Sequence, residues 1–196
     1  MKIRLLIALM ALGILALPSL ASAQAAEANP YVKLTTSMGE IVLELDPAAA
    51  PKTVANFIKY VEDGHYSGTI FHRVISNFMI QGGGMDKDMK ERRTRAPIAN
   101  EAKNGLKNNR YTVAMARTGD PHSATAQFFI STKDNDFLNF TAENTQGWGY
   151  AVFGKVVKGQ ETVDKIAQVK TGSIRGHENV PVTPIIIEKA EMVKSF

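Results

Sequence analysis

Alternating apolar and polar residues dominate the chain from Tyr31 onwards, and this period of two predicts short β-strands. Two such segments flank a turn at 37–39 and form an expected hairpin. Gly154 interrupts a later strand, which indicates a bulge or a close approach of another backbone. The later strands are expected at 112–116, 127–130, 150–157 and 184–193.

Two segments have the apolar spacing of an amphipathic helix. The first begins at Pro51, which suits the first turn of a helix, and stops at Gly64, where a C-terminal cap is needed. Its inward side chains follow the spacing i, i+3, i+4, i+7 at Val54, Phe57, Ile58 and Val61. The second helix is expected at 160–169, and residues 170–183 follow it as an expected loop.

About eight short strands, two helices and long loops make up this pattern. Many short strands favour a closed antiparallel barrel over parallel βαβ units, and the helices are expected to plug its ends. No internal repeat or linker divides the chain. The prediction is a mainly β fold: a closed eight-stranded antiparallel β-barrel capped by two α-helices, in one domain over 31–196.

The first thirty residues differ from the rest. Two basic residues precede an almost wholly apolar run at 5–17, and a small-x-small motif follows at 21–23. This is the pattern of a secretory signal peptide, because the apolar run is too short for a comfortable membrane span. We expect a signal peptide at 1–23, with cleavage within 23–25 as second choice, and a flexible tail at 24–30. The mature protein is then exported, with no stable membrane association.

The net charge of +4 is too mild to argue for a nucleic-acid partner. Loss of Lys2 and Arg4 with the signal peptide leaves 21 of the 23 basic residues against 19 acidic ones, a charge near +2. A basic run at 92–95 lacks interleaved aromatic residues and follows acidic ones, so we expect a solvated loop and no nucleic-acid binding. The absence of Cys excludes disulfides and a lipid-modified N-terminal Cys.

The most informative stretch is FHRVISNFMIQGG at 71–83. Arg73 and Gln81 are embedded there among large apolar side chains, and a plain core strand has no use for either. The stretch therefore indicates one wall of a groove, with apolar side chains to seat a ligand and two polar groups to orient it. The alternative is an arginine that extends to water from a strand edge.

The sequence lacks the residues that several kinds of catalysis require. There is no Cys nucleophile and no Gly-x-Ser-x-Gly or His-Glu-x-x-His motif, and the four His residues are not spaced as metal ligands. The glycines at 82–84 are not followed by the Lys of a phosphate loop. We therefore expect no metal and no cofactor, and hydrolysis by a standard nucleophile is disfavoured.

Three further motifs accompany the stretch at 71–83: AMAR at 114–117, AQFFI at 126–130 and YAVFGKV at 150–156. Together, and in this order, they resemble the cyclophilins, a family of peptidyl-prolyl cis-trans isomerases. The resemblance extends from about Tyr31 to Val193 and implies the same eight-stranded barrel capped by two helices. It is greatest to the short-loop bacterial members, and with the signal peptide it implies a periplasmic protein.

The resemblance assigns roles position by position. Arg73 corresponds to the family's catalytic arginine, and Gln81 to a catalytic neighbour beside the substrate backbone. The walls of the family's proline pocket correspond to Phe78, Met79, Phe129 and Leu138. Other expected substrate-binding residues are His72, Ala116, Arg117, Gln127, Phe137 and Tyr150.

Three positions depart from the common family pattern. Arg117 stands where many members have Asn, but the hydrogen bonds there come from the backbone, so little change is expected. Phe137 replaces a tryptophan whose indole N–H contacts cyclosporin, and phenylalanine has no such donor. We therefore expect weak cyclosporin binding with activity kept. Tyr150 replaces a groove histidine, which bears on substrate preference more than on catalysis.

The implied reaction is rotation about X-Pro peptide bonds in exported proteins, which assists their folding. Amide resonance opposes this rotation by about 18–20 kcal/mol and is lost in the twisted state, where the proline nitrogen regains a lone pair. A donor aimed at that nitrogen, the role implied for Arg73, stabilises the twisted state and needs no covalent intermediate. The expected partners are proline-containing polypeptides, and the protein is expected to be a monomer.

Two other functions are compatible with the sequence. One is a proline-binding chaperone or scaffold without important turnover, against which an arginine kept beside an intact pocket argues. The other is a barrel that carries a small ligand in an open lumen, against which the two capping helices argue.

Overall fold

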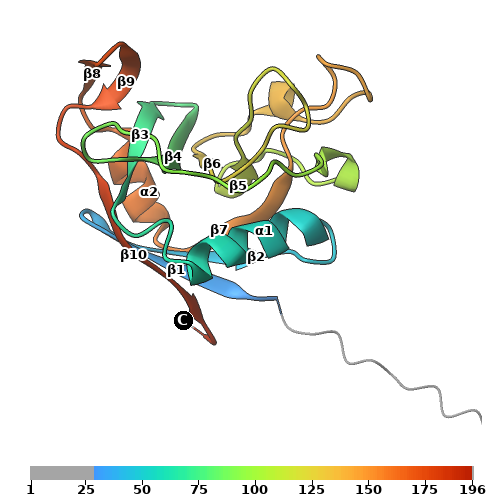
Figure 1. Cartoon of the computed structure of the whole chain (residues 1–196), viewed down its shortest axis with the longest axis horizontal. Helices are drawn as coiled ribbons and strands as arrows, with labels where there is room; N and C mark the ends of the chain where they lie inside the picture. The colour runs from blue at the N-terminus through green and yellow to red at the C-terminus, as the bar shows by residue number, and fades with distance from the viewer. Residues whose placement is uncertain (1–28, 196) are drawn as a thin grey trace, which may run out of the picture.

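The computed structural model describes residues 29–195 of the 196-residue chain. The expected signal peptide at 1–23 lies outside the described residues, as do positions 24–28 of the expected tail. The described part contains ten strands and two α-helices, drawn in chain order in Figure 1. No helix between residues 29 and 195 has the length and hydropathy of a membrane span.

Eight of the strands close into an antiparallel barrel in the order β1-β10-β3-β4-β6-β5-β7-β2, so the predicted fold is confirmed. Neighbours along the chain form the β1–β2 and β3–β4 hairpins, and β10 returns to close the barrel between β1 and β3. The strand bounds are Tyr31–Thr36 (β1), Gly39–Leu45 (β2), Thr69–Ile75 (β3), Met79–Asp86 (β4), Thr112–Met115 (β5), Phe128–Ser131 (β6), Val152–Lys158 (β7) and Ile186–Val193 (β10).

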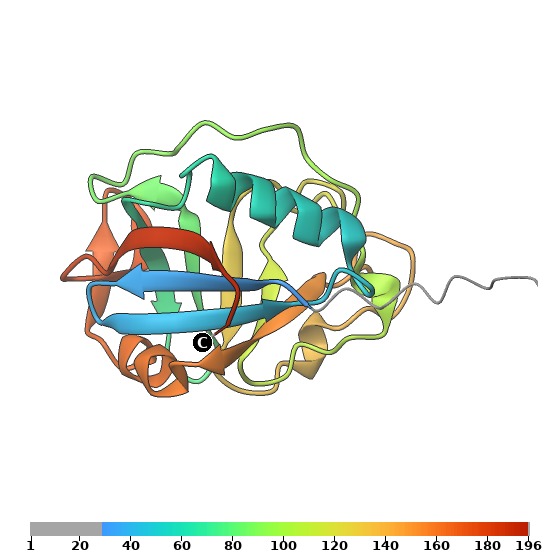
Figure 2. The same ribbon diagram turned by 90° about the horizontal axis from the view of Figure 1, so that it is seen from below.

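The two helices are α1 (Pro51–Glu62) and α2 (Gln160–Ala167), close to their predicted ranges. Pro51 occupies the first helical turn, where its missing N–H is not needed. Gly64 follows α1 with a φ of +69°, a left-handed conformation that glycine adopts without strain. Figure 2 shows α1 and α2 on opposite sides of the barrel, as expected of caps.

The inward side chains of the strands and both helices form one buried cluster. Phe57 of α1 is central to it, with its ring 5.5 Å from that of Phe128 and 5.0 Å from that of Phe153. Tyr66 is also fully buried, and its hydroxyl donates to the Ala126 carbonyl at 2.9 Å. Each such aromatic side chain contributes about 1.5–3 kcal/mol by its burial. The space that a ligand-carrying barrel keeps open is therefore filled here.

Gly154 lies where three strands come close together, which confirms the predicted close approach. It pairs with Leu45 of β2 on one side and with Val113 of β5 on the other. A Cβ atom at position 154 would lie 2.4 Å from the carbonyl oxygen of Glu44, much closer than van der Waals contact allows. Glycine at this position therefore lets β2 approach β7.

The segment 170–183 differs from its prediction as a loop. It contains a hairpin outside the barrel, formed by β8 (Thr171–Ile174) and β9 (His177–Pro181). The turn has two residues, Arg175 and Gly176, with φ values of 52° and 82°. Positive φ at both positions suits a tight hairpin turn, but arginine is not among the residues typical of such a turn. The sequence signal was therefore weak.

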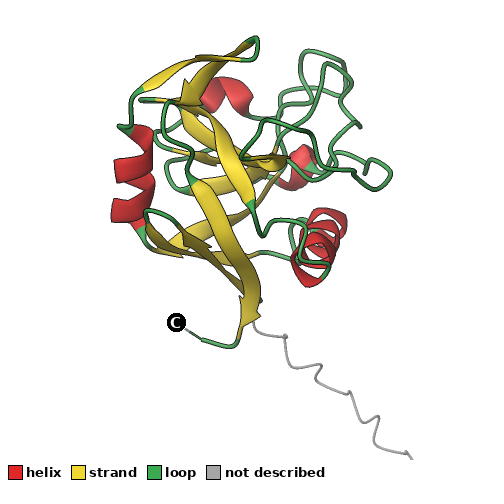
Figure 3. Ribbon diagram, turned by 60° about the vertical axis from the view of Figure 1, so that its left-hand side comes forward, coloured by secondary structure: helices red, strands yellow, loops and turns green. Residues whose placement is uncertain are grey.

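Long loops connect the remaining strands, as the green segments of Figure 3 show. They contain only two short 3-10 helices in the described part of the chain, η1 (Ala102–Asn104) and η2 (Asp136–Leu138). The basic run at 92–95 is a mainly exposed loop, as predicted. Arg92 donates to the His65 carbonyl at 2.7 Å, and Arg95 pairs with Asp63 at the end of α1. Two of its three arginines are thus engaged with neighbouring segments.

Candidate active site

A groove of about 510 Å³ lies against β3, β4 and β6 on the outside of the barrel core. The alternation of side chains along β6 explains its position. Phe128 and Ile130 point into the barrel core, whereas Phe129 between them belongs to a second, smaller apolar cluster. Phe129, one of the expected pocket-wall residues, therefore lines the groove.

The apolar base of the groove combines residues from three separate segments. Met79 of β4, Phe129 of β6 and Leu138 of η2 are each buried, with exposed fractions of 2%, 4% and 8%. Phe78 adds a half-buried ring at one side, and the Tyr150 ring meets Phe129 edge-on at 5.6 Å. The four expected wall residues thus lie together although they span 60 positions of sequence, from 78 to 138.

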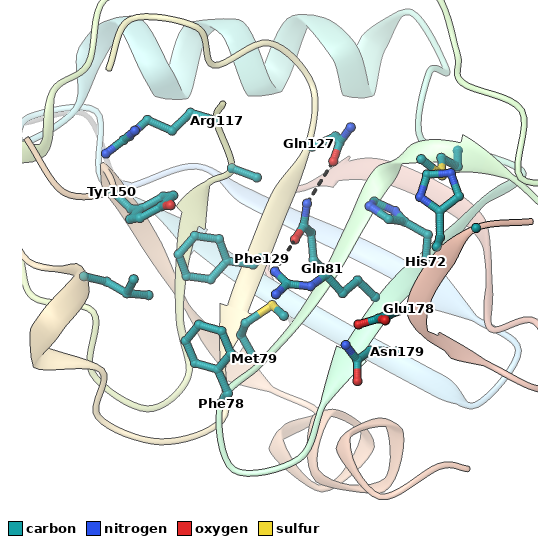
Figure 4. A pocket seen from close by; sticks show the side chains of 16 residues that line it. His72, Phe78, Met79, Gln81, Arg117, Gln127, Phe129, Tyr150, Glu178 and Asn179 are labelled. Atoms are coloured by element: carbon teal, nitrogen blue, oxygen red, sulfur yellow. Dashed lines mark hydrogen bonds between the residues drawn. The ribbon is translucent and has the colours of Figure 1, made fainter. Parts of the chain in front are cut away.

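A row of polar side chains lies next to this apolar base (Figure 4). Arg73 of β3 stands opposite Gln81 of β4 in the strand register, and its Nη1 donates to Gln81 Oε1 at 3.4 Å. Gln81 Nε2 donates in turn to Gln127 Oε1 at 2.9 Å. The three residues therefore form a hydrogen-bonded chain along one side of the groove.

Arg73 is exposed, although its neighbours in the sequence are large apolar residues. It extends to water from its strand, as the alternative reading held, and it lines the groove as well. The guanidinium keeps much of its hydration, so it needs no buried partner.

Gly84 leaves room for the side chain of Gln127. A Cβ atom at residue 84 would lie 2.5 Å from Gln127 Cγ and 2.6 Å from its Nε2, so only glycine leaves room for this side chain. The run of glycines that resembled no phosphate loop thus has a packing role beside the groove.

Arg117 and Tyr150 form a stacked pair across the groove from β3. The Arg117 guanidinium lies 4.6 Å from the centre of the Tyr150 ring. Its Nε donates to the Gly149 carbonyl and its Nη1 to the Thr118 carbonyl, both at 2.9 Å. The side chain is therefore held in place, and it contributes a fixed positive charge in addition to the backbone groups considered from the sequence.

His72 is buried behind the polar row, with 6% of its surface exposed. Burial lowers the pKa of its imidazole from 6.5 to about 4, since a charged ring would lose its hydration there. Within the described residues its Nδ1 has no hydrogen-bond partner. His72 is therefore neutral at physiological pH and supplies no charge to the groove.

The lowered pKa of His72 predicts a loss of stability in acid. Because its pKa is about 4 in the folded protein and near 6.5 in the unfolded chain, the unfolded state binds more protons between those values. The contribution of the neutral imidazole to the free energy of unfolding is complete above pH 6.5. It decreases by up to about 3 kcal/mol as the pH falls towards 4. Urea unfolding of wild type and His72→Gln across this range should show a shallower pH dependence in the variant. Equal slopes would contradict the assignment.

Eleven of the twelve predicted site residues line this one groove; Phe137 does not. Its ring is 71% exposed and stacks on Phe78, with 5.5 Å between ring centres and 29° between planes. The sequence also missed Met85 and residues 176–179, which line the groove from β4 and the β8–β9 hairpin. No local motif marks these positions, because their approach to the groove depends on how the hairpin folds back onto β3.

Residues 29–195 contain no group of three or more His, Cys, Asp or Glu side chains that could hold a metal ion. The side chains that meet in the groove can instead bind apolar surface and donate hydrogen bonds. These features define the class as a filled β-barrel with an external binding groove that combines apolar surface with hydrogen-bond donors.

Comparison with known proteins specifies the class. The family model of the "Cyclophilin type peptidyl-prolyl cis-trans isomerase/CLD" matches residues 31–192. A peptidyl-prolyl cis-trans isomerase of Streptomyces antibioticus is 66% identical over 83% of this chain and 98% of its own length. Peptidyl-prolyl cis-trans isomerase B of Escherichia coli is 57% identical over 80% of this chain and 96% of its own.

Isomerase A of Dickeya dadantii is 51% identical over 92% of this chain and 94% of its own. The crystal structure of a cyclophilin from Cryptosporidium parvum aligns with a TM-score of 0.69 at 27% identity, covering 86% of this chain and 99% of that one. The chain therefore belongs to the cyclophilin-type peptidyl-prolyl cis-trans isomerases.

Proposed function

We propose that this isomerase acts through Arg73, which stabilises the twisted X-Pro amide by donating a hydrogen bond to the proline nitrogen. The observation that carries the proposal is the hydrogen-bonded row of Arg73, Gln81 and Gln127 beside a buried apolar base. A donor that is already oriented stabilises charge that develops only in the twisted state, and so lowers the barrier.

The remaining groove residues hold the substrate in this mechanism. Phe78, Met79, Phe129 and Leu138 seat the proline ring, because they offer a concave apolar surface. Gln81 and the backbone near Arg117 bind the chain on the acyl side of the rotating C–N bond, so that the other part rotates. No covalent intermediate forms.

An exchange experiment tests the function directly. Addition of the protein to an Ala-Pro peptide should broaden its cis and trans NMR signals, because exchange accelerates from its uncatalysed time of tens of seconds. Binding without faster exchange would favour the proline-binding scaffold instead. A co-purifying small ligand would favour a carrier, although the filled barrel core argues against that function.

We further propose that the protein is exported to the periplasm, where it acts as a monomer on folding polypeptides. Support comes from the signal-peptide pattern at 1–23. N-terminal sequencing of protein from fractionated cells should find a periplasmic chain that begins near residue 24. A cytoplasmic chain that retains residues 1–23 would contradict the proposal.

Weak cyclosporin binding belongs to the same proposal. Phe137 projects into solvent against Phe78 and offers no hydrogen-bond donor. Phe137→Trp should tighten cyclosporin inhibition by roughly two- to tenfold, the worth of one added hydrogen bond. Phe137→Leu serves as control and should give no gain. Equal inhibition constants for wild type and the tryptophan variant would refute this explanation.

A further inference from the structure

The β8–β9 hairpin brings a carboxylate to the substrate groove. Residues 176–179 all line the cavity, together with Arg73 and the apolar base. In Figure 4, Glu178 and Asn179 lie on the His72 side of the groove, across the Phe129 ring from Arg117 and Tyr150. No sequence motif marks this segment as functional.

A β-bulge explains why these side chains face the groove. Gly172 pairs with Val180 and Ile174 pairs with His177, so one residue of β8 stands opposite two residues of β9, Glu178 and Asn179. Asn179 has a φ of 59°, a left-handed conformation that bends the strand locally. Bulges redirect side chains in this way and are common next to functional sites.

Glu178 is the only acidic side chain among the described residues that line the groove; Arg73 and Arg117 are the basic ones. The Glu178 side chain is exposed and makes no hydrogen bond or ion pair within residues 29–195. Arg73 instead donates to Gln81, and Arg117 is held by backbone carbonyls on the opposite side. The groove thus has a positive end at Arg117 and a free negative charge at the hairpin.

We propose that Glu178 is a specificity residue, which selects substrates with basic residues directly after the proline. This inference rests on the proposed function, in which the acyl side of the substrate lies near Gln81 and Arg117. Residues after the proline then continue past Arg73 towards β9. Successive residues of an extended chain advance by about 3.3–3.6 Å, so the next side chains reach the bulge.

The test uses three peptides that carry Lys-Lys, Gln-Gln or Glu-Glu after the same Ala-Pro pair. NMR exchange at pH 8 and low salt gives kcat/KM, without a coupling protease that has preferences of its own. Wild type should favour the Lys peptide over the Gln peptide by about two- to fivefold, as one exposed ion pair allows. The Glu peptide should be slower still, and 0.5 M salt should reduce the differences.

Glu178→Gln should remove the preference, so that the Lys, Gln and Glu peptides exchange at similar rates. Glu188→Gln is the matched control, because Glu188 is an exposed carboxylate on β10 that does not line the groove; it should keep the preference. Equal rates for all three peptides in wild type, or a preference that survives Glu178→Gln, would overturn the inference. So would a preference for lysines placed before the proline.

The same experiment distinguishes failure of the proposed function from failure of the Glu178 inference. If no peptide exchanges faster, the Arg73 mechanism fails, while chemical-shift titration of the same peptides still measures binding. Tighter binding of the Lys peptide that Glu178→Gln abolishes would then support the charge selection alone. Equal affinities in that titration would overturn it.

Discussion

Arg73→Ala should reduce kcat/KM for an Ala-Pro peptide by about 10²–10³-fold, the usual loss when one preorganised donor to a transition state is removed. The loss should fall mainly on kcat, because the planar ground state offers no lone pair on nitrogen and gains little from this donor. Stability should change little, since Arg73 is exposed and its hydrogen bond to Gln81 is long, at 3.4 Å. Exchange NMR and thermal unfolding measure the two effects separately.

Arg93→Ala is the matched control, because it removes the same charge from an exposed loop that does not line the groove. It should keep the wild-type rate. Arg73→Lys keeps the positive charge but lacks the planar guanidinium with its paired donors. Its rate should therefore lie between those of Arg73→Ala and wild type. If Arg73→Ala folds and retains the wild-type rate, Arg73 has no part in the mechanism. Catalysis would then depend on substrate binding in the apolar pocket.

Gly154→Ala should destabilise the barrel strongly. Its Cβ would meet the Glu44 carbonyl at 2.4 Å, and a backbone oxygen cannot turn aside as a flexible side chain can. Overpacking of this kind lowers the free energy of unfolding by about 2–3 kcal/mol. In a chain of this size that corresponds to a fall in Tm of about 5–10 °C.

Gly119→Ala provides the comparison, because nothing lies within 4 Å of a Cβ at position 119. Its Tm should stay near that of wild type. Equal Tm values for the two alanine variants would show that β2 and β7 separate at little cost, and that Gly154 has no packing role.

The periodicity of apolar residues predicted much of the fold, because it follows directly from which side chains are buried. The alternation along β1 and β2 and the helical spacing of α1 are local consequences of which side chains leave water. These features identified the barrel and both caps correctly. Pro51 and Gly64 marked the ends of α1 for equally local reasons, since each constrains its own backbone.

The sequence placed Arg73 in a groove wall but left its exposure open, because periodicity does not reveal which strand positions face solvent at a groove. Arg73 and Gln81 are eight positions apart, yet they face each other only through the register of β3 and β4. Gln127 joins them because β6 pairs with β4 and because Gly84 leaves room for its side chain. Strand register and close packing are tertiary properties that no local window contains.

The sequence by itself determined the barrel and its caps, because local spacing reflects which side chains are buried. Its family motifs, each a run of neighbouring residues, also pointed to eleven of the residues that line the groove. Only the tertiary structure separated the apolar cluster around Phe129 from the main barrel core and brought Glu178 of the hairpin to the groove. Those placements depend on contacts between segments distant in the chain: the pairing of β6 within the barrel, and the bulged hairpin folding against β3.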